Sequence, residues 1–312
     1  THAGARLQTL ATAQGYFPEL AAAPDGVVYS VLRGGGGHYG RDAGLDLMIS
    51  RDGGVSFSPP RAIVRTEWDD RNPALGVAPD GTLVLAYYKM GSYDATGHFD
   101  GEILRYQTGI VRSTDGGATF GPETTLSGTP FDGSSPYGRI VVLPGAPPTL
   151  LLALYGVTAV PGDDPAAPEV VSTSFFIRSR DLGATWGDPT LVAHRHNESA
   201  ITLLPDGQLL GALRSDGGEP SLSVTRSVDG GRTFSAPVAV TGPLMHPGDL
   251  VALSHGRVLL VYGCRRPPFG VRALISHDGG LAWGSEIIIA DDCSTSDCGY
   301  PSAVRLPSGR IL

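Results

Sequence analysis

Ser50 to Phe57 read SRDGGVSF, and the chain repeats this pattern four more times. The other copies are STDGGATF from Ser113, SRDLGATW from Ser179, SVDGGRTF from Ser227 and SHDGGLAW from Ser276. Each copy has Ser first, Asp two places later, Gly at the fifth position and Phe or Trp at the eighth. The pattern predicts one fixed turn, in which the Asp carboxylate accepts backbone N–H groups, Gly takes a positive φ and the aromatic ring packs into a sheet.

Six tight turns between apolar runs alternate with these copies. They are APDG (23–26), APDG (78–81), LPGAPP (143–148), LPDG (204–207), LSHG (253–256) and LPSG (306–309). A turn and a motif together punctuate a four-stranded antiparallel sheet, so the sequence predicts an all-β fold, a six-bladed β-propeller forming a single domain over residues 1–312. Because the sequence stops at Leu312, midway through a second strand, we expect the last blade to be truncated and residues 7–13 to add an outer strand.

The composition excludes several classes of protein. A net charge of −8 argues against a nucleic-acid partner, because phosphate binding needs a basic face. The sequence has no run of about 18 apolar residues, so it predicts no membrane span. It also has no metal-ligand spacing, and we expect neither a metal nor an organic cofactor. We expect the protein to be a monomer. In a secreted protein, Cys293 and Cys298 are expected to form a disulfide, which leaves Cys264 as a small buried residue.

The topology of a propeller separates its two faces. The repeated motifs occupy turns between third and fourth strands, so the loops between second and third strands and between blades lie on the opposite face. Arginines gather in those loops, and pairs of guanidinium groups bind a carboxylate in bidentate fashion. The alternative is that loops simply carry charges. Two loops, at residues 89–106 and 156–171, are long enough to form rims or lids.

The serial S-x-D-x-G-x-x-F/W motifs resemble the Asp boxes of the sialidase superfamily, and the resemblance covers nearly the whole chain. Asp boxes alone imply only the fold, since they also occur in non-catalytic propellers and in other glycosidases. The resemblance implies a secreted or extracellular protein that acts on an acidic glycan.

Three local matches carry the resemblance further. In sialidases an N-E-S element at the start of a blade's first strand faces an arginine at the end of the second, which makes Glu198 the activating carboxylate and Arg214 a substrate-carboxylate ligand. The alternative is that Glu198 caps a surface loop and pairs with Arg214. Tyr300 matches the nucleophilic tyrosine, or else is an ordinary aromatic residue at the start of a strand. Asp42 matches the acid/base aspartate, or else is a loop aspartate with a structural role.

The remaining arginines complete the expected site. Arg266 resembles a further carboxylate ligand, and Arg272 is the second choice for that role. Arg33 resembles an arginine near the acid, and Arg71 resembles a site element between the first two blades or else forms a loop ion pair. Either of them is expected to help hold the substrate carboxylate. One departure stands out: sialidases open the first blade with F-R-I-P, whereas this chain has Tyr16-Phe17-Pro18. Either Arg33, Arg41 or Arg71 supplies the missing charge, or the substrate is not an ordinary sialic acid.

The resemblance therefore implies a retaining exo-sialidase in which a neutral phenol, with a usual pKa of about 10, attacks as its proton passes to Glu198. Two alternatives remain. One is a hydrolase or lyase for another acidic sugar such as a uronic acid, and the other is a propeller that binds glycans without catalysis.

Overall fold

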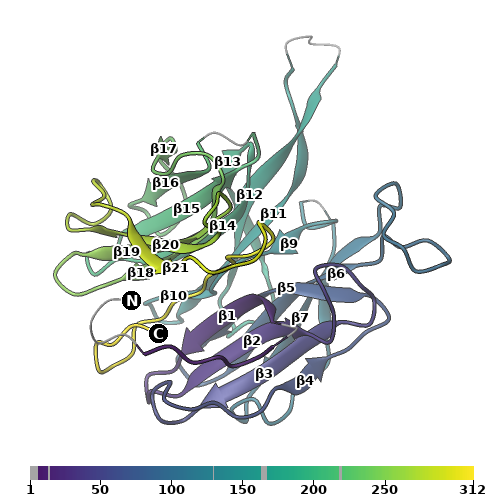
Figure 1. The fold of residues 1–312 in the computed structure, drawn as a ribbon. Coiled ribbons are helices and arrows are strands. Elements are labelled where there is room, and N and C mark those ends of the chain that lie inside the picture. The colour runs from purple at the N-terminus through teal and green to yellow at the C-terminus, as the bar shows by residue number, and fades with distance from the viewer. Residues whose placement is uncertain (1–5, 13–14, 129, 163–166, 218–219) are drawn as a thin grey trace.

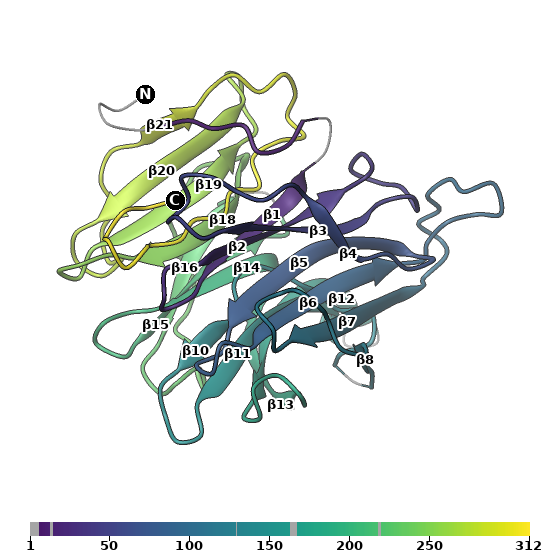
Figure 2. The ribbon, with the colours of Figure 1, turned by 90° about the horizontal axis from the view of Figure 1, so that it is seen from below.

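The computed structural model describes residues 6–12, 15–128, 130–162, 167–217 and 220–312. Within these ranges the regular structure consists of strands, which form five separate antiparallel sheets, here called blades 1 to 5 (Figures 1 and 2). Blade 1 contains β1 (Tyr16–Ala22), β2 (Val28–Gly34), β3 (Gly44–Ser50) and β4 (Arg61–Val64). Blade 2 contains β5 (Asp69–Val77), β6 (Leu83–Met90), β7 (Tyr106–Ser113) and β8 (Thr124–Leu126).

Blade 3 contains β9 (Ser135–Pro136), β10 (Val141–Leu143), β11 (Thr149–Val160), β12 (Glu169–Ser179) and β13 (Gly187–His194). Blade 4 contains β14 (His196–Leu203), β15 (Leu209–Ser215), β16 (Leu222–Ser227) and β17 (Val238–Ala239). Blade 5 contains β18 (Met245–Ala252), β19 (Val258–Cys264), β20 (Gly270–Ser276) and β21 (Ile287–Ala290). Within each blade, strands that follow one another in the chain pair side by side, except that β9 and β10 both pair with β11, which is the β-propeller pattern that the sequence predicts.

The prediction of six blades is wrong in number. Instead of a sixth sheet, residues 302–312 form a short hairpin, in which Val304 and Leu312 exchange backbone hydrogen bonds of 2.8 and 2.9 Å. The hairpin packs between blades 5 and 1, against Val251 on one side and Val28 on the other (Figure 2). A single pair of short segments cannot supply the four strands of a blade. The expected outer strand at residues 7–13 is also not found, since residues 7–12 form no strand and Ala13 lies outside the described residues.

The Asp boxes take the predicted place. Each begins at the last residue of its blade's third strand, as Ser50 does in β3 and Ser227 in β16. In the first box, the Gly54 N–H donates to the Ser50 hydroxyl at 2.8 Å, and the Ser56 N–H donates to Asp52 at 2.9 Å. Every bond of this kind closes within four residues, so the short motif is sufficient to specify the turn.

The apolar core consists of layers between successive blades. Leu45 and Leu47 of blade 1 pack with Leu83 and Leu85 of blade 2, and equivalent layers follow between the later blades. The predicted loop at 156–171 is largely strand, because β11 and β12 continue as a long hairpin that projects beyond the other sheets (Figure 1). The predicted rim at 89–106 is irregular, and its tip carries an isolated bridge between Tyr93 and Phe99.

No described helix is long and apolar enough to cross a membrane.

Candidate active site

The first strands of blades 1, 2, 4 and 5 each have a β-bulge near their start. The register with the second strand shifts between Tyr16 and Glu19, Arg71 and Ala74, His196 and Ser199, and Met245 and Gly248. Such bulges redirect side chains, and they are common beside active sites. Two bulge residues, Phe17 and Asn72, have left-handed backbone conformations, with φ of 51° and 46°. The bulges lie on the face opposite the Asp boxes, where the sequence places the site.

A cavity of about 570 Å³ opens on this face. Its lining joins both ends of the chain, with Phe17 and Gly37 from blade 1 and Cys298 and Tyr300 from the segment after blade 5. A second, narrower space is lined by Phe17 and Tyr300 as well, together with Asn72.

Glu198 and Arg214 form an ion pair in blade 4. Arg214 ends the regular part of β15 and returns beside the start of β14, where Glu198 is only 6% exposed. Burial by itself lowers the pKa of Arg214, but the adjacent Glu198 carboxylate outweighs that effect and raises it. Arg214 therefore stays positively charged.

Tyr300 lies among groups of both charges. Burial raises the pKa of its hydroxyl, and Glu198 raises it further, while Arg265 and Arg214 act in the opposite direction. The Arg265 guanidinium lies 5.1 Å from the centre of the Tyr300 ring. Among the described residues the Glu198 carboxylate bonds to Arg214 and not to the Tyr300 hydroxyl, so its effect on Tyr300 is electrostatic. The phenol is therefore neutral at pH 7.

Arg265, and not Arg266, faces this tyrosine. Arg266 is exposed, whereas Arg265 is partly buried and its Nε and NH2 nitrogens have no hydrogen-bond partner. Neighbouring residues after the end of β19 point in different directions, which a sequence alone does not resolve. Arg272, the second choice from the sequence, is buried and donates a hydrogen bond to the Pro268 carbonyl at 2.9 Å.

His246 lies beside the two arginines of this group. Burial lowers the pKa of His246 to about 3, and the charges of Arg214 and Arg265 act in the same direction. The ring is therefore neutral, and its buried Nδ1 has no hydrogen-bond partner.

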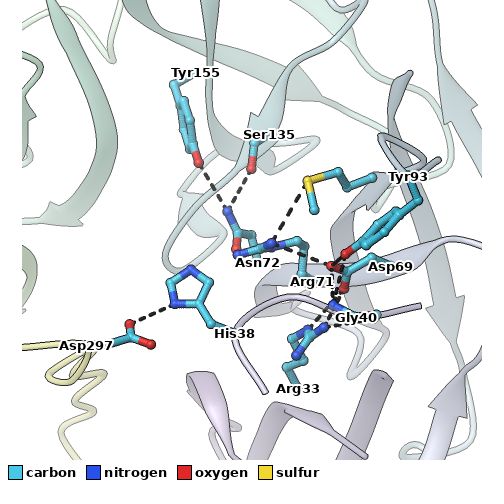
Figure 3. A network of polar contacts seen from close by, with 11 residues as sticks. Arg33, His38, Gly40, Asp69, Arg71, Asn72, Tyr93, Ser135, Tyr155 and Asp297 are labelled. Carbon is cyan, nitrogen blue, oxygen red and sulfur yellow. Dashed lines mark hydrogen bonds and ion pairs between the residues drawn. The ribbon is translucent and has the colours of Figure 1, made fainter. Parts of the chain in front are cut away.

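Arg33 and Arg71 belong to a buried network around Asp69 (Figure 3). Arg33 is fully buried, and its Nε and NH2 nitrogens donate to Asp69 Oδ1 at 3.1 and 2.7 Å. Arg71 lies 3.6 Å from the other Asp69 oxygen, and its guanidinium is 5.0 Å from the ring centre of Phe17 and 4.7 Å from that of Tyr39. Both arginines are therefore buried beside Asp69, and their predicted contact with a substrate stays a prediction.

Asn72, which follows Arg71 in β5, is oriented by two residues of blade 3 (Figure 3). Its Nδ2 donates to the Ser135 hydroxyl and the Tyr155 hydroxyl, each at 3.1 Å. Its Oδ1 is buried without a hydrogen-bond partner, although the residue is only 7% exposed. A fixed, unsatisfied acceptor beside a cavity is a candidate ligand contact.

The loop between β2 and β3 covers one side of the cavity. It carries Asp42, which is exposed, and His38, whose Nδ1 lies 2.7 Å from Asp297 (Figure 3). The His38 ring is 6.3 Å from the Tyr300 ring and 5.2 Å from the Phe17 ring. Burial lowers the pKa of His38, and its bond to Asp297 opposes this shift.

Beneath the site, a buried cluster of charged residues links blades 1, 3 and 5. Arg139 pairs with Asp249 at 2.7 Å and lies 3.9 Å from Glu19, which accepts a hydrogen bond from Ser302 at 3.1 Å. Burial raises the pKa of Glu19 to about 8; Asp249 raises it further and Arg139 lowers it.

The predicted disulfide is not formed, because all three cysteines are free thiols. Burial raises the pKa of Cys298 to about 11, and a hydrogen bond with Cys293 contributes in the same direction. No group of three or more His, Cys, Asp or Glu that could hold a metal ion occurs in the described ranges.

Sequence reasoning gave no role to Arg265, His246 or Asn72. The sequence carried a signal for Asn72 and His246, because each precedes a proline and such pairs recur near the start of a blade's first strand. The pairs are Phe17-Pro18, Asn72-Pro73, Ser135-Pro136, His246-Pro247 and Tyr300-Pro301. In blade 4 the position that corresponds to Pro18 of blade 1 is occupied by Glu198.

Comparisons with known proteins agree with this architecture. A protein of unknown function from Dyadobacter fermentans matches over 96% of this chain and 89% of its own, at 24% identity and a TM-score of 0.75. The Hadza microbial sialidase Hz136 matches over 93% of this chain and 61% of its own, at 18% identity and a TM-score of 0.69. An intramolecular trans-sialidase from Ruminococcus gnavus matches over 95% of this chain and 88% of its own, at 15% identity and a TM-score of 0.66.

These similarities to solved structures establish the fold alone. No curated protein sequence matches the chain significantly. The BNR repeat-like domain family matches residues 68–312, which is well over half of the chain and includes four of its five Asp boxes. The chain therefore belongs to the family of BNR repeat-like domains.

Proposed function

We propose that this protein is a retaining exo-glycosidase of sialidase type, which releases a terminal acidic sugar from a glycan outside the cell. The observation that carries the proposal is the position of Tyr300, among the Glu198 carboxylate and the Arg214 and Arg265 guanidinium groups. The fold similarity to a sialidase and a trans-sialidase supports the same class of reaction.

Each group has a role in the proposed reaction. Arg265, with unsatisfied N–H groups, and Arg214 hold the sugar carboxylate. The Tyr300 oxygen attacks the anomeric carbon and its proton passes to Glu198, while Asp42 protonates the leaving oxygen. In the second half, Asp42 removes a proton from water, which displaces tyrosine from the sugar, and Tyr300 regains its proton from Glu198.

A neutral nucleophile suits an acidic substrate. A carboxylate nucleophile would repel the negatively charged sugar, whereas the raised pKa keeps the Tyr300 phenol uncharged until attack. Transfer of its proton to Glu198 requires the carboxylate to turn from Arg214 or to use a bridging water.

A second candidate is hydrolysis of a different acidic sugar, such as a uronic acid. It is favoured by the Tyr16-Phe17 pair, which stands in the place of the first sialidase arginine and of which Phe17 contacts Tyr300 directly. Two guanidinium groups, instead of three, then face the substrate carboxylate.

The test is release of sugar from fluorogenic sialosides and uronosides, with NMR identification of the anomer that forms first. We expect retention of configuration, and a loss of turnover of about 10³-fold or more in Tyr300→Phe. Tyr262→Phe is the matched control, because Tyr262 bonds to Glu286 at 2.9 Å in blade 5 and should affect only stability. Binding of acidic sugars without release of any would instead identify a non-catalytic glycan-binding propeller.

A further inference from the structure

A run of aromatic rings leads from Tyr300 to the rim of the molecule. The Tyr300 and His38 rings are 6.3 Å apart, and the His38 and Tyr39 rings are stacked at 4.7 Å with planes inclined by 25°. The Tyr39 and Phe99 rings follow at 5.0 Å and 34°. The run thus connects Tyr300, which lines the cavity, to the loop between β6 and β7.

The outer two rings are open to solvent. Tyr39 is 54% exposed and Phe99 is 47% exposed, even though the Arg71 guanidinium and the His38 ring lie against Tyr39. Exposed aromatic surface is unfavourable in water, and contiguous exposed apolar groups mark interaction sites.

Both rings sit on well-fixed backbone. Phe99 pairs with Tyr93 across a small hairpin, whose neighbouring residues are joined by the bond from the Asp100 N–H to the Ser92 carbonyl at 2.8 Å. The Tyr93 hydroxyl donates to Asp69 at 2.5 Å and accepts from the Gly40 N–H at 2.9 Å, which ties this hairpin to the loop of Tyr39 (Figure 3). A surface held in this way loses little entropy when a ligand binds.

The chemistry of the surface favours a sugar chain. A pyranose presents a face of C–H groups with partial positive charge, which packs on the negative face of an aromatic ring. Two half-exposed rings are far too small for a stable protein interface, which buries about 1,200–2,000 Å². The run also starts at the residue that is proposed to bond to the terminal sugar, so the next sugars of the chain would extend toward the rim.

We propose that Tyr39 and Phe99 form a platform that binds the neutral sugars following the terminal acidic residue of a glycan chain. The proposal rests on the proposed function for its direction, because it places the terminal sugar at Tyr300. It implies a preference for oligosaccharides over glycosides with a small leaving group.

The test measures binding by calorimetry to the Tyr300→Phe protein, which removes turnover from the comparison. The ligands are the trisaccharide 3′-sialyllactose and methyl α-sialoside, with the corresponding uronic-acid-terminated trisaccharide and methyl uronoside as a second pair. We expect Tyr39→Ala and Phe99→Ala each to weaken trisaccharide binding about threefold to tenfold and to leave methyl glycoside binding unchanged. Leu104→Ala is the matched control, since Leu104 is a 79% exposed aliphatic residue of the same loop.

Unchanged trisaccharide binding in both variants, or an equal loss for both ligands of a pair, would overturn the platform while leaving the proposed function intact. If neither acidic ligand binds, the proposed function fails, and the platform is then decided by NMR saturation transfer from the protein to lactose. Loss of that transfer in the Tyr39→Ala, Phe99→Ala double variant would support the platform, and its persistence would overturn it. Circular dichroism would establish that the variants are folded.

Discussion

The ring of Phe17 meets the ring of Tyr300 edge to face, with 4.6 Å between their centres and an angle of 83° between their planes. Phe17 comes from the first strand and Tyr300 from the segment after the last blade, so the contact closes the site between the two ends of the chain. The centre of the same ring lies 5.0 Å from the Arg71 guanidinium. Phe17 and its neighbour Tyr16 thus stand where the family resemblance places an arginine.

Replacing Phe17 with arginine tests whether the apolar ring determines which acidic sugar binds. We expect Phe17→Arg to strengthen binding of sialic acid by about tenfold, because one charge-assisted hydrogen bond contributes about 1.5–3 kcal/mol. Calorimetry with sialic acid and its amide checks this, with Phe17→Leu as the apolar control. An equal change for acid and amide would show that Phe17 does not face the carboxylate.

The neighbouring arginines of blade 5 provide a second comparison. We expect Arg265→Ala to weaken binding of an acidic sugar about tenfold to a hundredfold, whereas Arg266→Ala should have little effect, since only Arg265 lies against Tyr300. Fluorescence titration of both variants with one acidic sugar makes the measurement. A greater loss in Arg266→Ala would contradict the placement of the two side chains.

The acid assignment can be tested on the loop between β2 and β3. We expect Asp42→Asn to lower kcat/KM by about 10²–10⁴-fold for substrates with poor leaving groups and much less for activated aryl glycosides, because the latter need no protonation. His38→Gln should affect both substrates equally through the lost contact with Asp297. The opposite result would assign the acid to His38.

Glu19 should make folding stability depend on pH. Its pKa rises from 4.5 in the unfolded chain to about 8 in the folded protein, so the folded state holds a proton that the unfolded state releases between these values. Its contribution is therefore complete below pH 4.5 and is lost as the pH rises through about 8. Thermal unfolding of wild type and Glu19→Gln between about pH 5 and 9 should show a flatter profile for the variant. Parallel profiles would mean that Arg139 keeps Glu19 ionised.

The Asp boxes should affect folding and not chemistry. Asp229 accepts hydrogen bonds from the Arg232 and Thr233 N–H groups, each at 2.9 Å, on the face opposite the site. We expect Asp229→Ala to lower the melting temperature by a few degrees and Asp229→Asn to lower it less, with turnover per folded molecule unchanged. Calorimetric scans together with turnover measured on the folded fraction make the comparison. A selective loss of turnover would be incompatible with a purely structural motif.

The sequence by itself determined the repeated turns and the antiparallel blades. Each Asp box is held by bonds that span four residues or fewer, such as Gly117 N–H to the Ser113 hydroxyl, so its conformation is encoded locally. The short separation of Glu198 and Arg214 had the same advantage, because two neighbouring strands and one turn bring them together. The described residues form five sheets where six were predicted, because six turns were counted as six sheets and the last turn serves a hairpin.

Only the tertiary structure decided which arginines gather around Tyr300. Arg33 is occupied by Asp69, 36 residues away, and Arg139 by Asp249, 110 residues away, and no local pattern specifies such partners. Arg265 and Arg266 are adjacent in sequence, and only the path of the chain after β19 turns one toward Tyr300 and the other to solvent. Local motifs fix turns because the interacting groups are covalently close, whereas a propeller's site is assembled from strand ends that meet only when the ring of blades has packed.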